Sequence, residues 1–137
     1  MSEPITGGCA CGRVRYAIDA EPTLMLECRC RDCQRESGTG HASHLSFPRA
    51  AASVQGDATH WDAVGELGTT KRRAFCPTCG APVYMTFPEM PDVFVVRAGS
   101  LDDPSRYAPQ VILWMASAHP WDPVIPGLPT FDRMPPR

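Results

Sequence analysis

The chain has 137 residues, including 15 prolines and seven cysteines, and its formal net charge is −2. This length suits one domain, so we treat residues 1–137 as a single unit. Proline interrupts helix interiors, and its abundance argues against a helical bundle. No run of about 18 apolar residues could span a membrane. The first residues lack the basic and apolar regions of a signal peptide, so we expect a cytoplasmic protein.

Short strands separated by turns are predicted along most of the chain. Alternating apolar and polar residues predict a strand over 14–18, and a second strand is predicted over 24–28. Residues 31–37 could form one or two helical turns that end at Gly38. Further strands are predicted at 44–47, 52–55, 73–76, 83–87, 93–96 and 111–115. The proline-rich tail from His119 should be irregular, which leaves a mainly β fold with eight or nine short strands and little helix.

The seven cysteines fall into three groups. We call them the first pair (Cys9 and Cys11), the triplet (Cys28, Cys30 and Cys33) and the last pair (Cys76 and Cys79). In a C-x-C pair on extended chain both sulfurs point to one face, and in C-x-x-C a tight turn brings them together. The odd count and a reducing compartment argue against a disulfide framework. Zinc binding is the better explanation of this spacing.

A structural zinc ion takes four nitrogen or sulfur ligands, so seven thiols suggest two zinc sites per chain. One partition joins the first pair to the last pair and leaves the triplet as a separate site with an open position. The alternative joins Cys28 and Cys30 to the last pair. We favour the first partition because C-x-C-x-x-C is compact enough to bind one metal locally. An open position on zinc is where catalysis takes place.

Other candidate residues are less specific. His41 and His44 follow the triplet and could supply a fourth ligand or an acid–base group, although a lone histidine is usually structural. Tyr16 and Trp114 are predicted to be core residues. The basic run Lys71–Arg73 is predicted to be a solvated strand end. With no other basic run, the sequence does not favour nucleic-acid binding.

With these motifs in view, the chain resembles the GFA family of glutathione-dependent formaldehyde-activating enzymes, a domain shared with a centromere-associated protein. The matching stretches are Gly8–Tyr16, Cys28–Gly38, Phe75–Gly80, Ser117, Pro120–Trp121 and Gly127–Phe131. The resemblance implies a zinc-stapled β-tent of short antiparallel sheets. It also implies that the first and last pairs hold a structural zinc. Cys28, Cys30 and Cys33 would hold a second, catalytic zinc. Relatives often have histidine where this chain has Arg29.

The function implied by the resemblance is that of a zinc-dependent carbon–sulfur lyase. A small thiol, glutathione or another, would be activated at the triplet and would add to formaldehyde or another small carbonyl compound. Arg29, Arg31 and Arg35 would bind carboxylates of glutathione or simply balance the thiolate charge, and Trp121 would line the pocket or pin the tail to the core. Two alternatives stay open: a non-enzymatic module that binds zinc and glutathione, and a thiol redox enzyme with one zinc. The sequence does not specify an oligomeric state.

Overall fold

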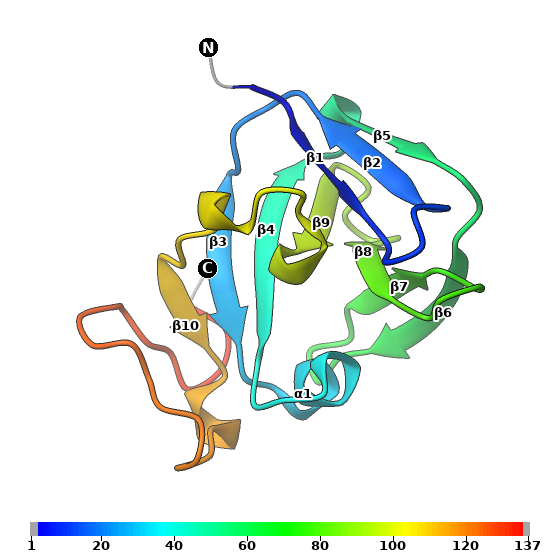
Figure 1. Ribbon diagram of the computed structural model, residues 1–137. Helices are drawn as coiled ribbons and strands as arrows, with labels where there is room; N and C mark the ends of the chain where they lie inside the picture. Colours follow the sequence, from blue (N-terminus) through cyan, green and yellow to red (C-terminus); the bar gives the residue numbers. More distant parts are fainter. Residues whose placement is uncertain (1–2, 136–137) are drawn as a thin grey trace.

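The computed structural model describes residues 3–135, which form two β-sheets (Figure 1). The small sheet has the antiparallel order β1-β2-β5, and these strands span Ile5–Gly8, Arg15–Ile18 and Ala52–Gln55. The large sheet has the order β10-β3-β4-β9-β8-β7-β6. Its strands, in chain order, are β3 (Leu24–Cys28), β4 (Ala42–Pro48), β6 (Thr59–Val64), β7 (Thr70–Phe75), β8 (Pro82–Thr86), β9 (Val93–Arg97) and β10 (Val111–Leu113).

Helical structure is short throughout the described residues. The α-helix α1 (Arg31–Ser37) follows β3 directly and ends at Gly38, which adopts a left-handed conformation with φ 76°. Four 3₁₀ turns complete the elements: η1 (Arg49–Ala51), η2 (Ala98–Ser100), η3 (Pro104–Arg106) and η4 (Met115–Ser117). Within residues 3–135, no helix is long and apolar enough to cross a membrane.

The main core lies between the two sheets. Alternation along β2 turns Tyr16 and Ile18 inward, and the large sheet contributes Leu45, Phe47 and Phe94 from the opposite side. All five side chains are almost completely buried. The Tyr16 ring meets Phe94 edge to face, with centroids 6.5 Å apart. Helix α1 lies beyond the ends of β3 and β4 (Figure 1).

The predicted mainly β architecture is confirmed, as are the helix over residues 31–37 and its end at Gly38. The described residues form ten strands, one or two more than expected. Strand β1 was missed because its sequence ends in two glycines, and β6 was missed because nearly all of its side chains are exposed and show no alternation. Strand β10 pairs with β3 in parallel, which corrects the expectation of purely antiparallel sheets.

Gly56 is predicted to be essential to the turn after β5. Its φ is +89°, and a Cβ there would lie 1.9 Å from the carbonyl oxygen of Arg13. A residue other than glycine in the left-handed conformation costs roughly 1–2 kcal/mol. Gly56→Ala should lower the free energy of unfolding by more than this, because the new Cβ would also collide with Arg13. Gly68→Ala is the matched control, since Gly68 has φ +85° and a Cβ there would meet nothing within 4 Å. If urea denaturation shows the same loss of unfolding free energy in both variants, the backbone at Arg13 can move away from the new Cβ without cost, and the prediction is wrong.

Candidate metal centres

The first and last pairs come together in one four-cysteine cluster. Their four sulfur atoms all lie within 4.8 Å of one another. The Cys11 sulfur is 3.6 Å from those of Cys9 and Cys76. Four thiolates around zinc at about 2.3 Å would place their sulfurs about 3.8 Å apart. The cluster could therefore hold one tetrahedral metal ion.

Backbone amides support these sulfurs from two turns. The N–H of Val14 donates to the Cys9 sulfur at 3.3 Å, and the N–H of Thr78 donates to the Cys76 sulfur at 3.4 Å. Burial by itself would raise the pKa of Cys9, but the Val14 amide and the neighbouring thiols lower it to about 6. One turn joins β1 to β2 and the other joins β7 to β8. The cluster therefore connects the small sheet to the large sheet.

The triplet forms a second cluster where β3 meets α1. Cys28 is the last residue of β3, Cys30 is the N-cap of α1, and Cys33 lies in its first turn. All three are buried, and their sulfurs lie within 4.8 Å of one another. Sulfur contacts with Cys28 and Cys33, and the N–H of Cys33 at 3.3 Å, hold the pKa of Cys30 well below its ordinary value. Cys28 and Cys30 thus lie with Cys33 and not with the last pair.

A buried group of charges adjoins the triplet. Glu36 on α1 forms ion pairs with Arg73, at 2.8 Å, and with Arg97. Burial favours the neutral form of Arg73, but the charges of Glu36 and then Cys33 raise its pKa above the ordinary value. Burial lowers the pKa of Arg97, an effect that Glu36 partly offsets. One positive charge is left beside the cysteines.

A large cavity, which we call the apolar cavity, lies on the face of the large sheet that points away from the main core. Its volume is about 700 Å³, and Cys28 and Cys33 form part of its wall. The polar lining includes His44 and Lys71. The apolar lining comes from Leu26, Leu67, Met85, Phe87, Met90, Val93, Val95, Leu113, Trp114, Met134 and Pro135.

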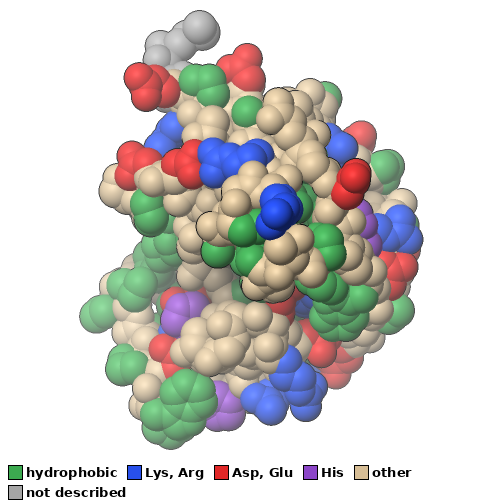
Figure 2. Space-filling model, turned by 45° about the vertical axis from the view of Figure 1, so that its right-hand side comes forward, with side chains coloured by type: hydrophobic (Ala, Val, Ile, Leu, Met, Phe, Trp, Pro, Cys, Tyr) green, Lys and Arg blue, Asp and Glu red, His purple; other side chains and the backbone are tan. Residues whose placement is uncertain are grey.

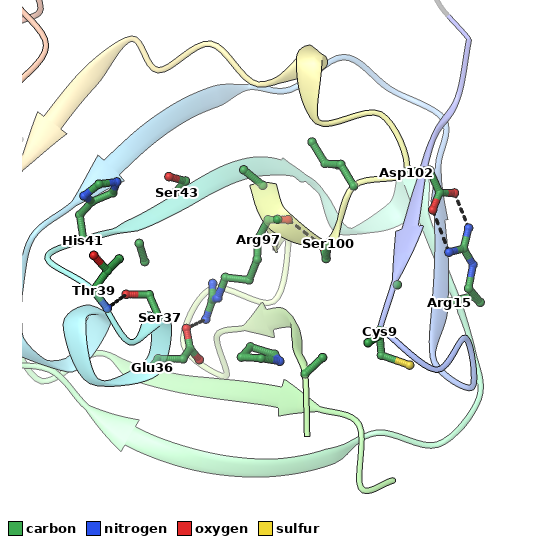
Figure 3. Close-up of a pocket in the computed structure, with 18 residues that line it drawn as sticks. Cys9, Arg15, Glu36, Ser37, Thr39, His41, Ser43, Arg97, Ser100 and Asp102 are labelled. Carbon is green, nitrogen blue, oxygen red and sulfur yellow. Dashed lines mark hydrogen bonds and ion pairs between the residues drawn. The ribbon is translucent and has the colours of Figure 1, made fainter. Parts of the chain in front are cut away.

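A second pocket, of about 590 Å³, is polar and lies between α1 and the small sheet. Figure 3 shows Arg97 reaching Glu36 inside it, the Arg15–Asp102 ion pair on one side and His41 on the other. Cys9 lies at its edge. The triplet is not part of the lining formed by the described residues, so this pocket does not open onto the three-cysteine centre.

Arg29 is completely buried and holds the tail against the triplet. Its Nε donates to Glu27 at 2.8 Å, and its Nη2 donates to the carbonyl oxygen of Pro123 at 3.1 Å. Its Nη1 also donates to the backbone of Asp122, whose carboxylate contacts the Nδ1 of His41 at 2.6 Å. The predicted role of Arg29 in binding substrate is therefore corrected, because its guanidinium faces protein groups on every side.

The other predicted binding residues lie outside both cavities. Arg31 and Arg35 are on α1, where Arg31 is exposed and contacts the side chain of Gln34, and Arg35 is exposed in the last turn. Trp121 is 64% exposed and stacks on His119, with centroids 4.8 Å apart. These positions make Arg31, Arg35 and Trp121 surface groups rather than parts of a pocket wall.

Two residues that matter at the site were misjudged from the sequence. Arg73 is 1% exposed, which corrects the expectation that the run Lys71–Arg73 is solvated. Alternation along β7 was the available signal, because it turns Lys71 and Arg73 to one face while Arg72 pairs outward with Asp62. Trp114 lines the apolar cavity in a left-handed conformation, with φ 64°, rather than packing in the main core.

The surface shows no gathering of one charge on the face in Figure 2. Lys and Arg side chains are mixed there with Asp and Glu. A nucleic-acid interface would collect basic side chains on one face or along one groove. The face shown in Figure 2 therefore has no such interface.

Removal of Arg29 is predicted to destabilise the fold. Arg29→Met removes the buried guanidinium that pairs with the Glu27 carboxylate, which is only 4% exposed, so the free energy of unfolding should fall by about 3–5 kcal/mol. Arg35→Met, on the exposed side of α1, should change it by no more than about 0.5 kcal/mol. Urea denaturation at a fixed zinc concentration measures both. Equal stability of the two variants would refute the structural role of Arg29.

The chain is similar to a known protein family and to a solved structure. A protein-family model described as glutathione-dependent formaldehyde-activating enzyme, GFA, matches residues 4–117. A crystal structure of a Rhodobacter sphaeroides protein has a similar fold, with a TM-score of 0.58 and 19% sequence identity over 92% of this chain and 99% of the other. The match to the family model covers both cysteine clusters and the whole of α1. The protein therefore belongs to the GFA family.

Proposed function

We propose that the protein is a zinc-dependent carbon–sulfur lyase whose triplet activates a small thiol, glutathione or a similar compound. The observation that carries the proposal is that three buried cysteines converge beside a cavity large enough for a substrate. Family membership supports chemistry between a thiol and a small carbonyl compound. The four-cysteine cluster is the structural zinc site in this proposal. Free thiols in both clusters suit a reducing compartment such as the cytoplasm.

The charges around the triplet support zinc at this position. Three thiolates around a divalent ion carry one negative charge in total. The group formed by Glu36, Arg73 and Arg97 carries one positive charge, and Lys71 in the cavity wall adds a second, so cations face the negative centre. Buried charges are costly unless they are paired in this way. Zinc bound at the triplet would lower the pKa of an entering thiol and orient its sulfur.

The chain's own residues would shape the reaction. Cys28 and Cys33 form part of the cavity wall, so a thiol entering the cavity meets the triplet from that side. Apolar walls exclude water, which strengthens the electrostatic effect of nearby charges on a thiolate. In the synthetic direction the sulfur attacks the carbonyl carbon, a carbon–sulfur bond forms, and the thiol proton ends on the carbonyl oxygen.

The zinc content of two serine variants tests the division between the clusters. We expect two zinc ions per chain in the wild type and one in Cys30→Ser, with near-ultraviolet circular dichroism unchanged. Cys79→Ser should be unfolded or insoluble, because metal binding can supply about 10–16 kcal/mol to a small domain. Elemental analysis without chelators makes the measurement. One zinc in both the wild type and Cys30→Ser would favour the redox alternative.

Turnover tests the lyase itself. Exchange NMR with glutathione and formaldehyde should show adduct formation accelerated at least a hundredfold by the wild type and not by Cys30→Ser. Arg72→Gln is the control, since Arg72 is an exposed residue paired with Asp62 and lies outside both cavities. Two zinc ions without acceleration of any thiol–carbonyl pair would instead favour the non-enzymatic module that binds zinc and glutathione.

A further inference from the structure

The apolar cavity is much larger than formaldehyde requires. Its volume is about 700 Å³, whereas an apolar cavity of about 150 Å³ already accommodates benzene. Sites of roughly 300–1,000 Å³ usually hold drug-sized ligands. Formaldehyde adds a single carbon to a thiol. Most of this volume is therefore available to a substituent that formaldehyde lacks.

The lining is poorly suited to the charged ends of glutathione. Glutathione carries two carboxylates and an ammonium group, each of which needs a partner when it is desolvated. Among the described residues, the charged side chains in the wall are Lys71, Glu66 and Arg133, and Glu66 and Arg133 pair with each other at 3.1 Å. Lys71 forms no ion pair within residues 3–135. One cation does not match a glutathione molecule, but it matches a single anionic oxygen.

The polar groups of the cavity lie close to the cysteines. His44 is 5% exposed, and its buried Nε2 has no hydrogen-bond partner among the described residues. His44 and Lys71 line the same cavity as Cys28 and Cys33. Met85, Phe87 and Val95 form a separate apolar cluster on the same face. The cavity thus combines a polar region beside the triplet with an apolar region.

We propose that the substrate at the triplet is a carbon–sulfur adduct with a bulky apolar substituent, an aromatic ring or a medium-length alkyl chain. The substituent packs against Met85, Phe87 and Val95, while the hydroxyl group of the adduct bonds to His44 Nε2 or Lys71. This inference rests on the proposed lyase function and narrows its substrate class. In the cleavage direction the carbon–sulfur bond breaks with its electron pair on sulfur, the hydroxyl oxygen becomes the carbonyl oxygen, and its proton passes to the sulfur.

Binding of simple thiols tests the substrate class without turnover. The zinc-loaded full chain is titrated with hexanethiol and with mercaptoethanol in a calorimeter. Each methylene group that becomes buried should tighten binding about fourfold, so hexanethiol should bind at least tenfold more tightly. Equal affinity for the two thiols would overturn the inference.

A matched pair of surface variants shows whether hexanethiol binds in the apolar cavity. Met90 lines the cavity and is 37% exposed, and Val124 has the same exposure outside it. Met90→Glu should weaken hexanethiol binding at least fivefold and leave mercaptoethanol unchanged, while Val124→Glu should alter neither. Met134→Glu, at another exposed point of the lining, replaces Met90→Glu if that variant fails to fold. Unchanged hexanethiol binding in the folded lining variant would place the thiol elsewhere and overturn the inference.

Two reaction arms show which partner carries the apolar group. Exchange NMR compares hexanal plus glutathione with formaldehyde plus hexanethiol, and glutathione plus formaldehyde is the reference. Faster exchange of either hexyl pair supports the inference and identifies the source of the substituent. Selective hexanethiol binding with no exchange for any pair would overturn the lyase function but support the ligand class. Fast exchange of the reference pair alone, with equal thiol affinities, would overturn the inference and leave the function standing.

Discussion

The four-cysteine cluster joins the two sheets of the protein. It draws its sulfurs from a turn of the small sheet and a turn of the large sheet, so a metal held there would fix the two sheets to each other. The small sheet has only three strands of four residues, and one of its faces packs against the large sheet. Tyr16 and Ile18 of the small sheet pack against the large sheet. A metal ion in the cluster would hold the two sheets in the position that this packing needs. The core and the cluster therefore support each other.

The triplet depends on this framework in a different way. Its cysteines lie at a strand end and a helix start, close in sequence, but their electrostatic partners come from distant strands. Arg73 on β7 and Arg97 on β9 meet Glu36 of α1 beside Cys33. These partners can assemble only when the strands of the large sheet are in register. A local sulfur motif thus acquires its charge environment from the complete sheet.

The tail and the two pockets follow from the same arrangement. Strand β10 adds to β3 in parallel, and the chain after it passes beside the triplet, where Arg29 and Gln34 bond to its backbone (Figure 1). Farther on, Arg133 lies over Trp114 and pairs with Glu66 at the cavity wall. Glu36 and Arg97, which pair with each other, line the polar pocket but not the apolar cavity. Of these two cavities, as the described residues line them, the apolar one includes Cys28 and Cys33.

Features that depend on neighbouring residues could be predicted from the amino-acid sequence: the grouping of the cysteines, the strand and helix that present the triplet, and the end of that helix at Gly38. The sequence also contained the motifs by which the family could be identified. Three features became visible in the folded chain alone: Arg29 and Arg73 are buried, β10 runs parallel to β3, and Trp114 lines a cavity. The physical reason is that burial of a charge depends on partners far away in the chain. Asp122 and the tail backbone close around Arg29, and no local pattern connects positions separated by more than ninety residues.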